Sequence, residues 1–240
     1  MAALRALFRL AGAAGLTAAN PAAALTKPRR VRGRRRALDD GEVVELIDAV
    51  RTTSHDPDLD LLAVRFHLES GARRQGALNL RRSDIDLRRA TVWLREKGEE
   101  REQPVSPALA TLLGRHAVLR SPVDTADGAV FRTINGHPMS ARRYDTIFGR
   151  ARPCLEWSDR TPVSAHVLRH TAITAVARLA GYPVAQAFAG HAPPSVTGRY
   201  LHATLAEVAT AVATLTGQAH PLGQTRRDRR APVLPDCRRR

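Results

Sequence analysis

The segment HVLRHTAITAVARLAGYPVAQAFAGHAPPSVTGRY, residues 166–200, decides how the rest of this chain is interpreted. His166 and Arg169 are three residues apart, so they share one face if the segment is helical. Ser164 is a suitable helix N-cap, and Gly181 is typical of a helix end. We therefore expect a helix that begins after Ser164, ends at Gly181 and presents an imidazole beside a guanidinium.

Apolar residues and a regular spacing continue this pattern on both sides of Gly181. The apolar stripe of the expected helix is made by three residues, Ile173, Val176 and Leu179. A second short helical run, residues 184–189, leads to His191, and Tyr200 follows nine residues later. Short helices and tight turns thus gather two imidazoles, a guanidinium and a phenol.

This set of side chains suits phosphoryl transfer to a tyrosine. An arginine fork matches phosphate oxygens, and a tyrosine hydroxyl can attack phosphorus if a neighbouring group takes its proton. Each residue also has a plainer interpretation: Tyr200 as a packed helix residue, and His191 as a loop histidine. His166 and His170 could alternatively bind zinc in a hydrolase, but Val167 stands where the H-E-x-x-H motif has its carboxylate.

The combined motif, H-x-L-R-H-T followed by A-G-H and a tyrosine nine residues on, resembles the C-terminal half of the tyrosine recombinase, or phage integrase, family. The match is specific in residue type and in spacing. It implies two further groups upstream, an arginine after a glycine turn and a lysine on a β-hairpin.

The stretch S-G-A-R-R-x-x-A-L-x-L-R-x-x-D-I-D, which begins at Ser70, resembles the first arginine box of that family. The matching arginine is Arg73, with Arg74 beside it. The family usually has an acidic residue three positions after this arginine, where Gly76 stands here. The resemblance therefore implies an Arg73 that lacks its usual orienting carboxylate.

The stretch after residue 90 resembles the lysine hairpin of the family. Lys97 precedes a glycine, and a basic residue and the pair P-V follow. No other lysine occurs between Lys27 and the end of the chain. An exposed turn lysine is the plainer interpretation of Lys97.

The resemblance implies a mechanism and a role for each group. Tyr200 would attack a DNA phosphodiester and form a 3′-phosphotyrosine, without metal ion, ATP or other cofactor. Arg73 and Arg169 would bind the non-bridging oxygens, and His191 would donate a further hydrogen bond. Lys97 would protonate the leaving 5′-oxygen, His166 would assist proton transfer at the tyrosine, and His170 would be structural. Double-stranded DNA and a synaptic tetramer of this chain are the implied partners.

The charge distribution is consistent with a polyanionic partner. The 240 residues carry a formal net charge of +15. Two segments hold most of it, residues 27–36 and the arginine-rich residues 225–240. Each is either a solvated segment or an arm that contacts phosphates. The residues of the first segment that we expect to bind DNA are Lys27, Arg29, Arg30, Arg32, Arg34, Arg35 and Arg36.

The remaining composition favours an intracellular globular protein. Hydrophobic residues make up 43% of the chain, which is enough for a packed core. Cys154 and Cys237 form neither a disulfide framework nor a zinc ligand set, and a reducing cytoplasm fits them. No apolar run reaches the roughly 20 residues of a membrane span.

Four regions are expected along the chain. Residues 1–26 match the last helix of a core-binding domain, with the helix itself at residues 3–14, and residues 27–36 form a basic linker. Residues 37–220 would be the integrase catalytic domain, and residues 221–240 a disordered basic tail. The resemblance thus covers the catalytic domain nearly whole and the core-binding domain barely.

The predicted fold is α+β and mainly α, a recombinase-like domain of helices with one small antiparallel sheet. Further helices are expected over residues 39–50, 59–69, 107–119, 140–152 and 204–215. Strands are expected over residues 85–87, 91–94, 103–105 and 128–131, with a turn over residues 97–100. The function that follows is a site-specific DNA recombinase or integrase. A weakly active or inactive DNA-binding remnant of such an enzyme is the alternative.

Overall fold

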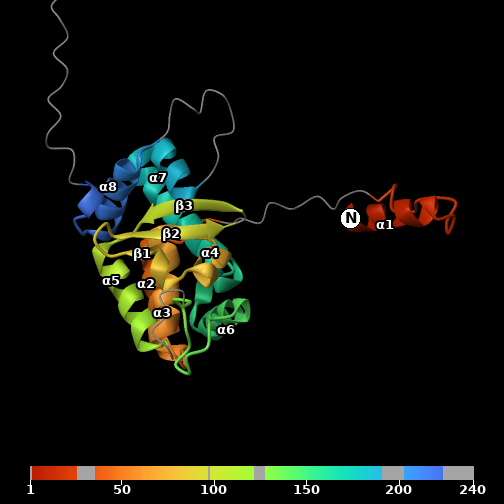
Figure 1. The fold of residues 1–240 in the computed structure, drawn as a ribbon. Coiled ribbons are helices and arrows are strands. Elements are labelled where there is room, and N and C mark those ends of the chain that lie inside the picture. Colours follow the sequence, from red (N-terminus) through yellow and green to blue (C-terminus); the bar gives the residue numbers. More distant parts are fainter. Residues whose placement is uncertain (1, 26–35, 97, 122–127, 191–202, 224–240) are drawn as a thin grey trace, which may run out of the picture. The chain divides into compact units, whose positions relative to one another are not determined.

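The computed structural model describes residues 2–25, 36–96, 98–121, 128–190 and 203–223. The chain divides into two compact units, residues 1–35 and residues 36–240. The described part of the second unit is a set of helices around one three-stranded antiparallel sheet (Figure 1). The predicted fold class, α+β and mainly α, is confirmed.

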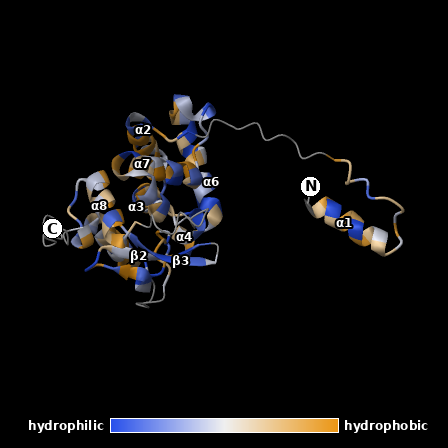
Figure 2. Cartoon of the chain, turned by 90° about the horizontal axis from the view of Figure 1, so that it is seen from above, coloured by the Kyte–Doolittle hydropathy of each residue, from blue (hydrophilic) through white to orange (hydrophobic). Residues whose placement is uncertain are grey.

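The first unit contains helix α1, Ala2–Ala13, close to the predicted residues 3–14. Apolar and polar residues alternate along it (Figure 2). The Arg5 guanidinium donates to the carbonyls of Ala22, at 3.1 Å, and Leu25, at 2.7 Å, which folds the following loop back on the helix. Leu7 and Leu10 remain exposed.

Helices α2, Asp40–Thr53, and α3, Pro57–Ser70, open the second unit. Asp39 and Glu42 form a capping box at the start of α2, within the predicted residues 39–50. Leu46, Ala49 and Val50 form the buried stripe of α2, whereas Val44 is 66% exposed. A helix has 3.6 residues per turn, so Val44 falls on its outer side.

The sheet consists of β1, Ile85–Asp86, β2, Thr91–Glu96, and β3, Glu99–Pro104, in that order. Pro104 lies at the end of β3, an edge strand of this sheet, where a missing backbone N–H is tolerated. The predicted turn over residues 97–100 is too long: Gly98 lies in a turn with φ at 79°, but Glu99 and Glu100 already pair with β2. The expected strand over residues 128–131 is an isolated bridge between Ala129 and Arg81.

The other helices follow the predicted order. They are α4, Arg74–Asn79, α5, Pro107–Leu119, α6, Ala141–Ala151, α7, Ala165–Ala189, and α8, Leu205–Thr216, with short 3-10 turns at Arg82–Asp84, Arg152–Cys154 and Glu156–Asp159. Ser164 caps α7, and Gly181, at φ 82° and ψ 173°, breaks it at the predicted residue. Both predicted helical runs therefore exist, joined across a kink.

Helix α8 packs on α7 and on β3 of the same chain. Its apolar stripe, Val208, Ala211 and Val212, forms a small core with Val176 and Phe188 of α7. None of the described helices is both long enough and apolar enough to cross a membrane.

Candidate DNA-cleavage site

The backbone that carries Arg73 is fixed by its neighbours. Gly71 ends α3 in the left-handed conformation, with φ at 59°, and Arg73 is the N-cap of α4. The buried His67 ring lies 2.9 Å from the Ala72 carbonyl through Nδ1 and 2.8 Å from the Tyr144 hydroxyl through Nε2. A carbonyl only accepts, so Nδ1 carries the proton and Nε2 accepts from Tyr144. The turn before Arg73 is thereby tied to two helices.

Arg169 extends from α7 toward the same turn. Its guanidinium donates to the Gly71 carbonyl, and to the Ala189 carbonyl at 2.6 Å. The residue is only 4% exposed, and this burial lowers the pKa of Arg169 to about 10. The guanidinium therefore stays charged at neutral pH and joins the ends of α3 and α7.

Glu96, the last residue of β2, lies between the arginines. Its carboxylate accepts from the Arg73 backbone N–H at 2.5 Å and from Arg73 Nη1 at 3.0 Å. Arg169 Nη1 and Arg101 Nη2 stand 3.8 and 3.9 Å from the same oxygen, Oε2. One buried carboxylate thus faces three guanidinium groups.

Gly76 makes room for that carboxylate. A Cβ atom at Gly76 would overlap Oε1 of Glu96 and would stand 2.9 Å from its Cγ. The expectation that Arg73 lacks an orienting carboxylate, drawn from Gly76, is therefore wrong. A carboxylate is present, and it comes from β2 instead of α4.

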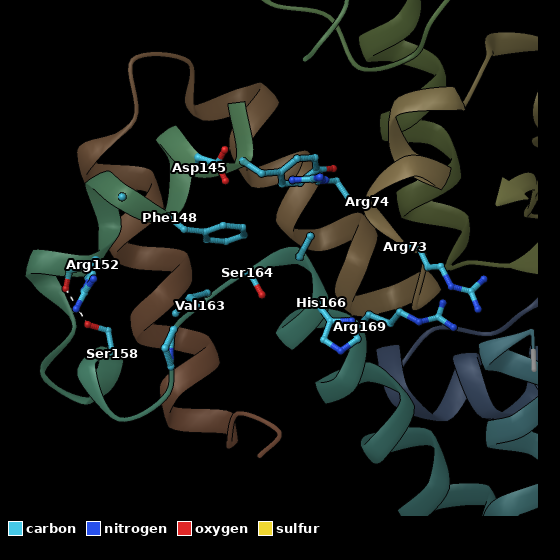
Figure 3. Close-up of a pocket in the computed structure, with 14 residues that line it drawn as sticks. Arg73, Arg74, Asp145, Phe148, Arg152, Ser158, Val163, Ser164, His166 and Arg169 are labelled. Carbon is cyan, nitrogen blue, oxygen red and sulfur yellow. Dashed lines mark hydrogen bonds between the residues drawn. The ribbon is translucent and has the colours of Figure 1, made fainter. Parts of the chain in front are cut away.

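The two arginines open onto a cavity of about 660 Å³. His166 and Arg169 both leave α7 to line this cavity, as their spacing predicts, and the Arg169 side chain extends away from His166 toward the guanidinium of Arg73 (Figure 3). His166 is exposed to the cavity. The structure brings together three of the six predicted catalytic residues, and the rim of the cavity is basic.

The other three, Lys97, His191 and Tyr200, lie outside the described residues. The same holds for the predicted DNA-binding residues Lys27, Arg29, Arg30, Arg32, Arg34 and Arg35. Arg36 is described, is about half exposed, and forms a bidentate ion pair with Glu42 of α2. Phosphate would have to compete with that carboxylate for Arg36.

The described tyrosines and the second histidine of α7 have other environments. Tyr144 is buried against His67, and burial raises its pKa, so its hydroxyl is a poor nucleophile. Tyr182 is 70% exposed beside the kink of α7. Nδ1 of His170 lies 3.5 Å from the Thr174 hydroxyl. Within the described ranges, no three His, Cys, Asp or Glu side chains gather as metal ligands would.

Comparison with known proteins agrees with this geometry. The profile of the Phage integrase family matches residues 36–207, which is most of the chain. The chain belongs to the phage integrase family, the tyrosine recombinases. Tyrosine recombinase XerC of Yersinia pestis is 28% identical over 231 residues, covering 92% of this chain and 71% of that protein. XerC of Serratia marcescens is 27% identical, covering 78% of this chain and 62% of its own length.

Solved structures of recombinases share the fold of this integrase-family chain. XerA recombinase superposes with a TM-score of 0.55 at 23% identity, over 91% of this chain and 75% of that one. A lambda integrase dimer bound to a COC′ core site gives a TM-score of 0.61 at 18% identity, over 82% and 56% of the two chains. At these identities the likeness concerns the fold.

Sequence reasoning missed Glu96 and gave Arg101 no role in this integrase site. Arg101 Nη1 donates to the Phe188 carbonyl at 2.8 Å, and burial lowers the pKa of Arg101 to about 10. Its Nη2 atom is buried and makes no hydrogen bond within the described part of the chain. The available signal was strand alternation: Val92, Leu94 and Glu96 share the inward face of β2, so an acidic residue ends an apolar row.

Proposed function

We propose that this chain cleaves and rejoins double-stranded DNA at specific sites through a covalent 3′-phosphotyrosine, with Tyr200 as the nucleophile. The observation that carries the proposal is the convergence of Arg73 and Arg169 on Glu96 at an open cavity, beside His166. Two guanidinium groups at one point are a suitable clamp for the non-bridging oxygens of a phosphodiester. The two XerC relatives described above are named tyrosine recombinases, which is consistent with a tyrosine nucleophile.

Each of the six groups has one role in the proposed reaction. The Tyr200 oxygen attacks phosphorus, the P–O5′ bond breaks, and the 5′-oxygen takes a proton from Lys97. His166 assists removal of the tyrosine proton, and His191 adds a hydrogen bond to the phosphate. Arg73 and Arg169 stabilise the charge that accumulates in the transition state. The 5′-hydroxyl of another strand then attacks the phosphotyrosine, so the bond energy is kept and rejoining requires no ATP.

DNA and further copies of the same chain are the partners of this reaction. Residues 27–36 and 225–240 would contact phosphates, which is consistent with their charge. Four regions would then follow one another: the last helix of a core-binding domain in residues 1–26, a basic linker in residues 27–36, the catalytic domain in residues 37–220 and a basic tail in residues 221–240. A synaptic complex of four copies on two duplexes would exchange the strands. Sedimentation of the protein with DNA that carries paired sites would detect this complex.

A suicide substrate tests the proposal directly. A duplex nicked beside the cleavage position loses its short 5′-hydroxyl fragment, so the covalent intermediate accumulates. The expected result is a protein–DNA adduct that survives denaturation in the presence of chelator. Tyr200→Phe should abolish the adduct and leave DNA binding nearly unchanged, whereas Tyr182→Phe, an exposed tyrosine of α7, serves as the matched control.

The outcomes separate the alternatives. An adduct that persists in Tyr200→Phe would move the nucleophile to another residue. Binding without any adduct would identify a DNA-binding remnant of the family. Hydrolysis restored only by added metal ion would favour a hydrolase that uses His166 and His170.

A further inference from the structure

We propose that Glu96 is the positioning residue of the active site, and that its carboxylate replaces an acidic side chain at position 76. The inference rests on the proposed function, because it concerns how Arg73 is held on the scissile phosphate. Helix α4 has no acidic side chain that could orient Arg73, and the carboxylate at the end of β2 takes over this role. Gly76 and Glu96 then form one functional pair, although they are 20 positions apart in sequence.

The contacts of Glu96 fix both ends of Arg73. Oε1 accepts from the Arg73 backbone N–H at 2.5 Å, and Oε2 accepts from Nη1 of the same residue at 3.0 Å. Because both its backbone N–H and its guanidinium are hydrogen-bonded to Glu96, the Arg73 side chain loses most of its rotamer freedom. Arg73 is about one fifth exposed and so faces the cavity from a fixed position.

Glu96 itself acts through Arg73 and not on DNA. The residue is only 3% exposed and is not among the residues that line the cavity, whereas Arg73 and Arg169 are. A buried carboxylate is costly unless it is paired and hydrogen-bonded, and here Arg73, Arg101 and Arg169 all face it. Because one negative charge faces three positive charges, the cluster keeps the net positive charge that a phosphodiester requires.

Positions 76 and 96 cannot both carry a side chain of this kind. The Cβ position at Gly76 overlaps Oε1 of Glu96 and lies 3.0 Å from its Cδ, so the space belongs to one carboxylate. An acidic residue at position 76 would therefore require a small residue at position 96. The proposal can therefore be tested by exchanging the residues at positions 76 and 96.

The first experiment measures cleavage and binding separately. Glu96→Gln keeps the shape of the side chain and removes its charge, and an amide N–H would face a donor of Arg73. A misplacement of about 1 Å can cost roughly 10²-fold in rate, so adduct formation on the suicide substrate should fall by about that factor. Binding of the same duplex should be unchanged or tighter, because a negative charge near the phosphate is lost.

The matched control is another buried carboxylate–arginine pair of the same sheet region. Asp84 is 8% exposed and pairs with Arg95 at 2.7 Å, away from the cavity. Asp84→Asn should lower thermal stability, and any loss of adduct formation in this variant should be matched by an equal loss of DNA binding. A structural role for Glu96 would make the two variants behave alike.

The exchange completes the test. Gly76→Glu alone should lower both stability and adduct formation, because it places a second carboxylate in an occupied space. Gly76→Glu combined with Glu96→Gly should form adduct at least 10-fold faster than Glu96→Gly alone. If Gly76→Glu unfolds the chain, Gly76→Asp with Glu96→Gly makes the same comparison.

Different results separate this proposal from the proposed function. An adduct through Tyr200 that forms at equal rates in wild type and Glu96→Gln would overturn the role of Glu96 and leave the function intact. No rescue by the exchange, in a folded double variant, would also overturn it. Absence of any wild-type adduct would overturn the proposed function, and with it the positioning role of Glu96 in cleavage.

Discussion

Arg73 and Arg169 differ as individual residues, although both are expected to bind the same phosphate. Each replacement by alanine should lower cleavage by about 10²–10³-fold, the usual effect of removing one donor to a developing charge. Only Arg169 also donates to two backbone carbonyls, those of Gly71 and Ala189. Arg169→Ala should therefore destabilise the fold as well, by about 1–3 kcal/mol for each acceptor left unsatisfied.

Adduct formation and thermal unfolding of the two variants check this prediction. Arg51→Ala is the control, because Arg51 is exposed and pairs with Asp48 on the surface of α2. Lysine at position 73 should restore little activity, since a point charge does not reproduce the bidentate fork. Equal losses of binding and cleavage would instead identify these arginines as DNA anchors.

His67 makes the stability of the fold depend on pH. Burial lowers its pKa from 6.5 to about 4, so the unfolded chain binds a proton more readily than the native chain. Stability should be highest above pH 6.5 and fall as the pH decreases toward 4, by on the order of 3 kcal/mol. Urea unfolding at several pH values measures the slope. His67→Gln should flatten it, whereas His55→Gln, at an exposed position, should not.

At the scale of elements, the joint between α3 and α7 depends on one glycine. Gly71 has φ at 59°, and a Cβ there would stand 2.5 Å from the Phe188 ring. Gly71→Ala should cost about 1–2 kcal/mol for the left-handed backbone and about 1–3 kcal/mol for overpacking. Gly217→Ala is the matched control, because Gly217 ends α8 at φ 66° with open space around it. Similar losses in the two variants would show that the contact with Phe188 contributes little.

The helices could be predicted from the sequence because their signals are local. The capping pair Asp39 and Glu42, the N-cap Ser164 and the break at Gly181 each act within a few residues of themselves. The role of Glu96 could not be predicted in the same way. It depends on the missing side chain of Gly76 and on Arg73, Arg101 and Arg169, which come from different elements.

The hairpin shows the same limit of local reasoning. Glutamates have low strand propensity, so residues 97–100 resembled a turn, but backbone pairing with β2 places Glu99 and Glu100 in a strand. The spacing of His166 and Arg169 predicted their common helix face, and both side chains line the cavity. The catalytic roles of all six predicted residues stay predictions.

At the scale of the whole molecule, DNA affinity should depend steeply on salt. Residues 225–240 carry seven arginines and two aspartates. Each phosphate contact that is lost should reduce the slope of log affinity against log salt by roughly 0.9. Deletion of residues 225–240 should therefore flatten the slope, as measured by binding titrations between 50 and 200 mM salt. An unchanged slope would show that these arginines do not contact DNA.

The three arginines around Glu96 have a consequence for handling the DNA-free protein. Glu96 neutralises only one of the three positive charges, so this cluster should attract small multivalent anions from the buffer when DNA is not bound. An anion that binds only the native state raises its stability in proportion to the logarithm of its concentration. Pyrophosphate should thus raise the melting temperature of the wild type more than that of Arg73→Ala, and should compete with DNA. Purification and assay in phosphate-free buffer would then give the higher apparent affinity for DNA.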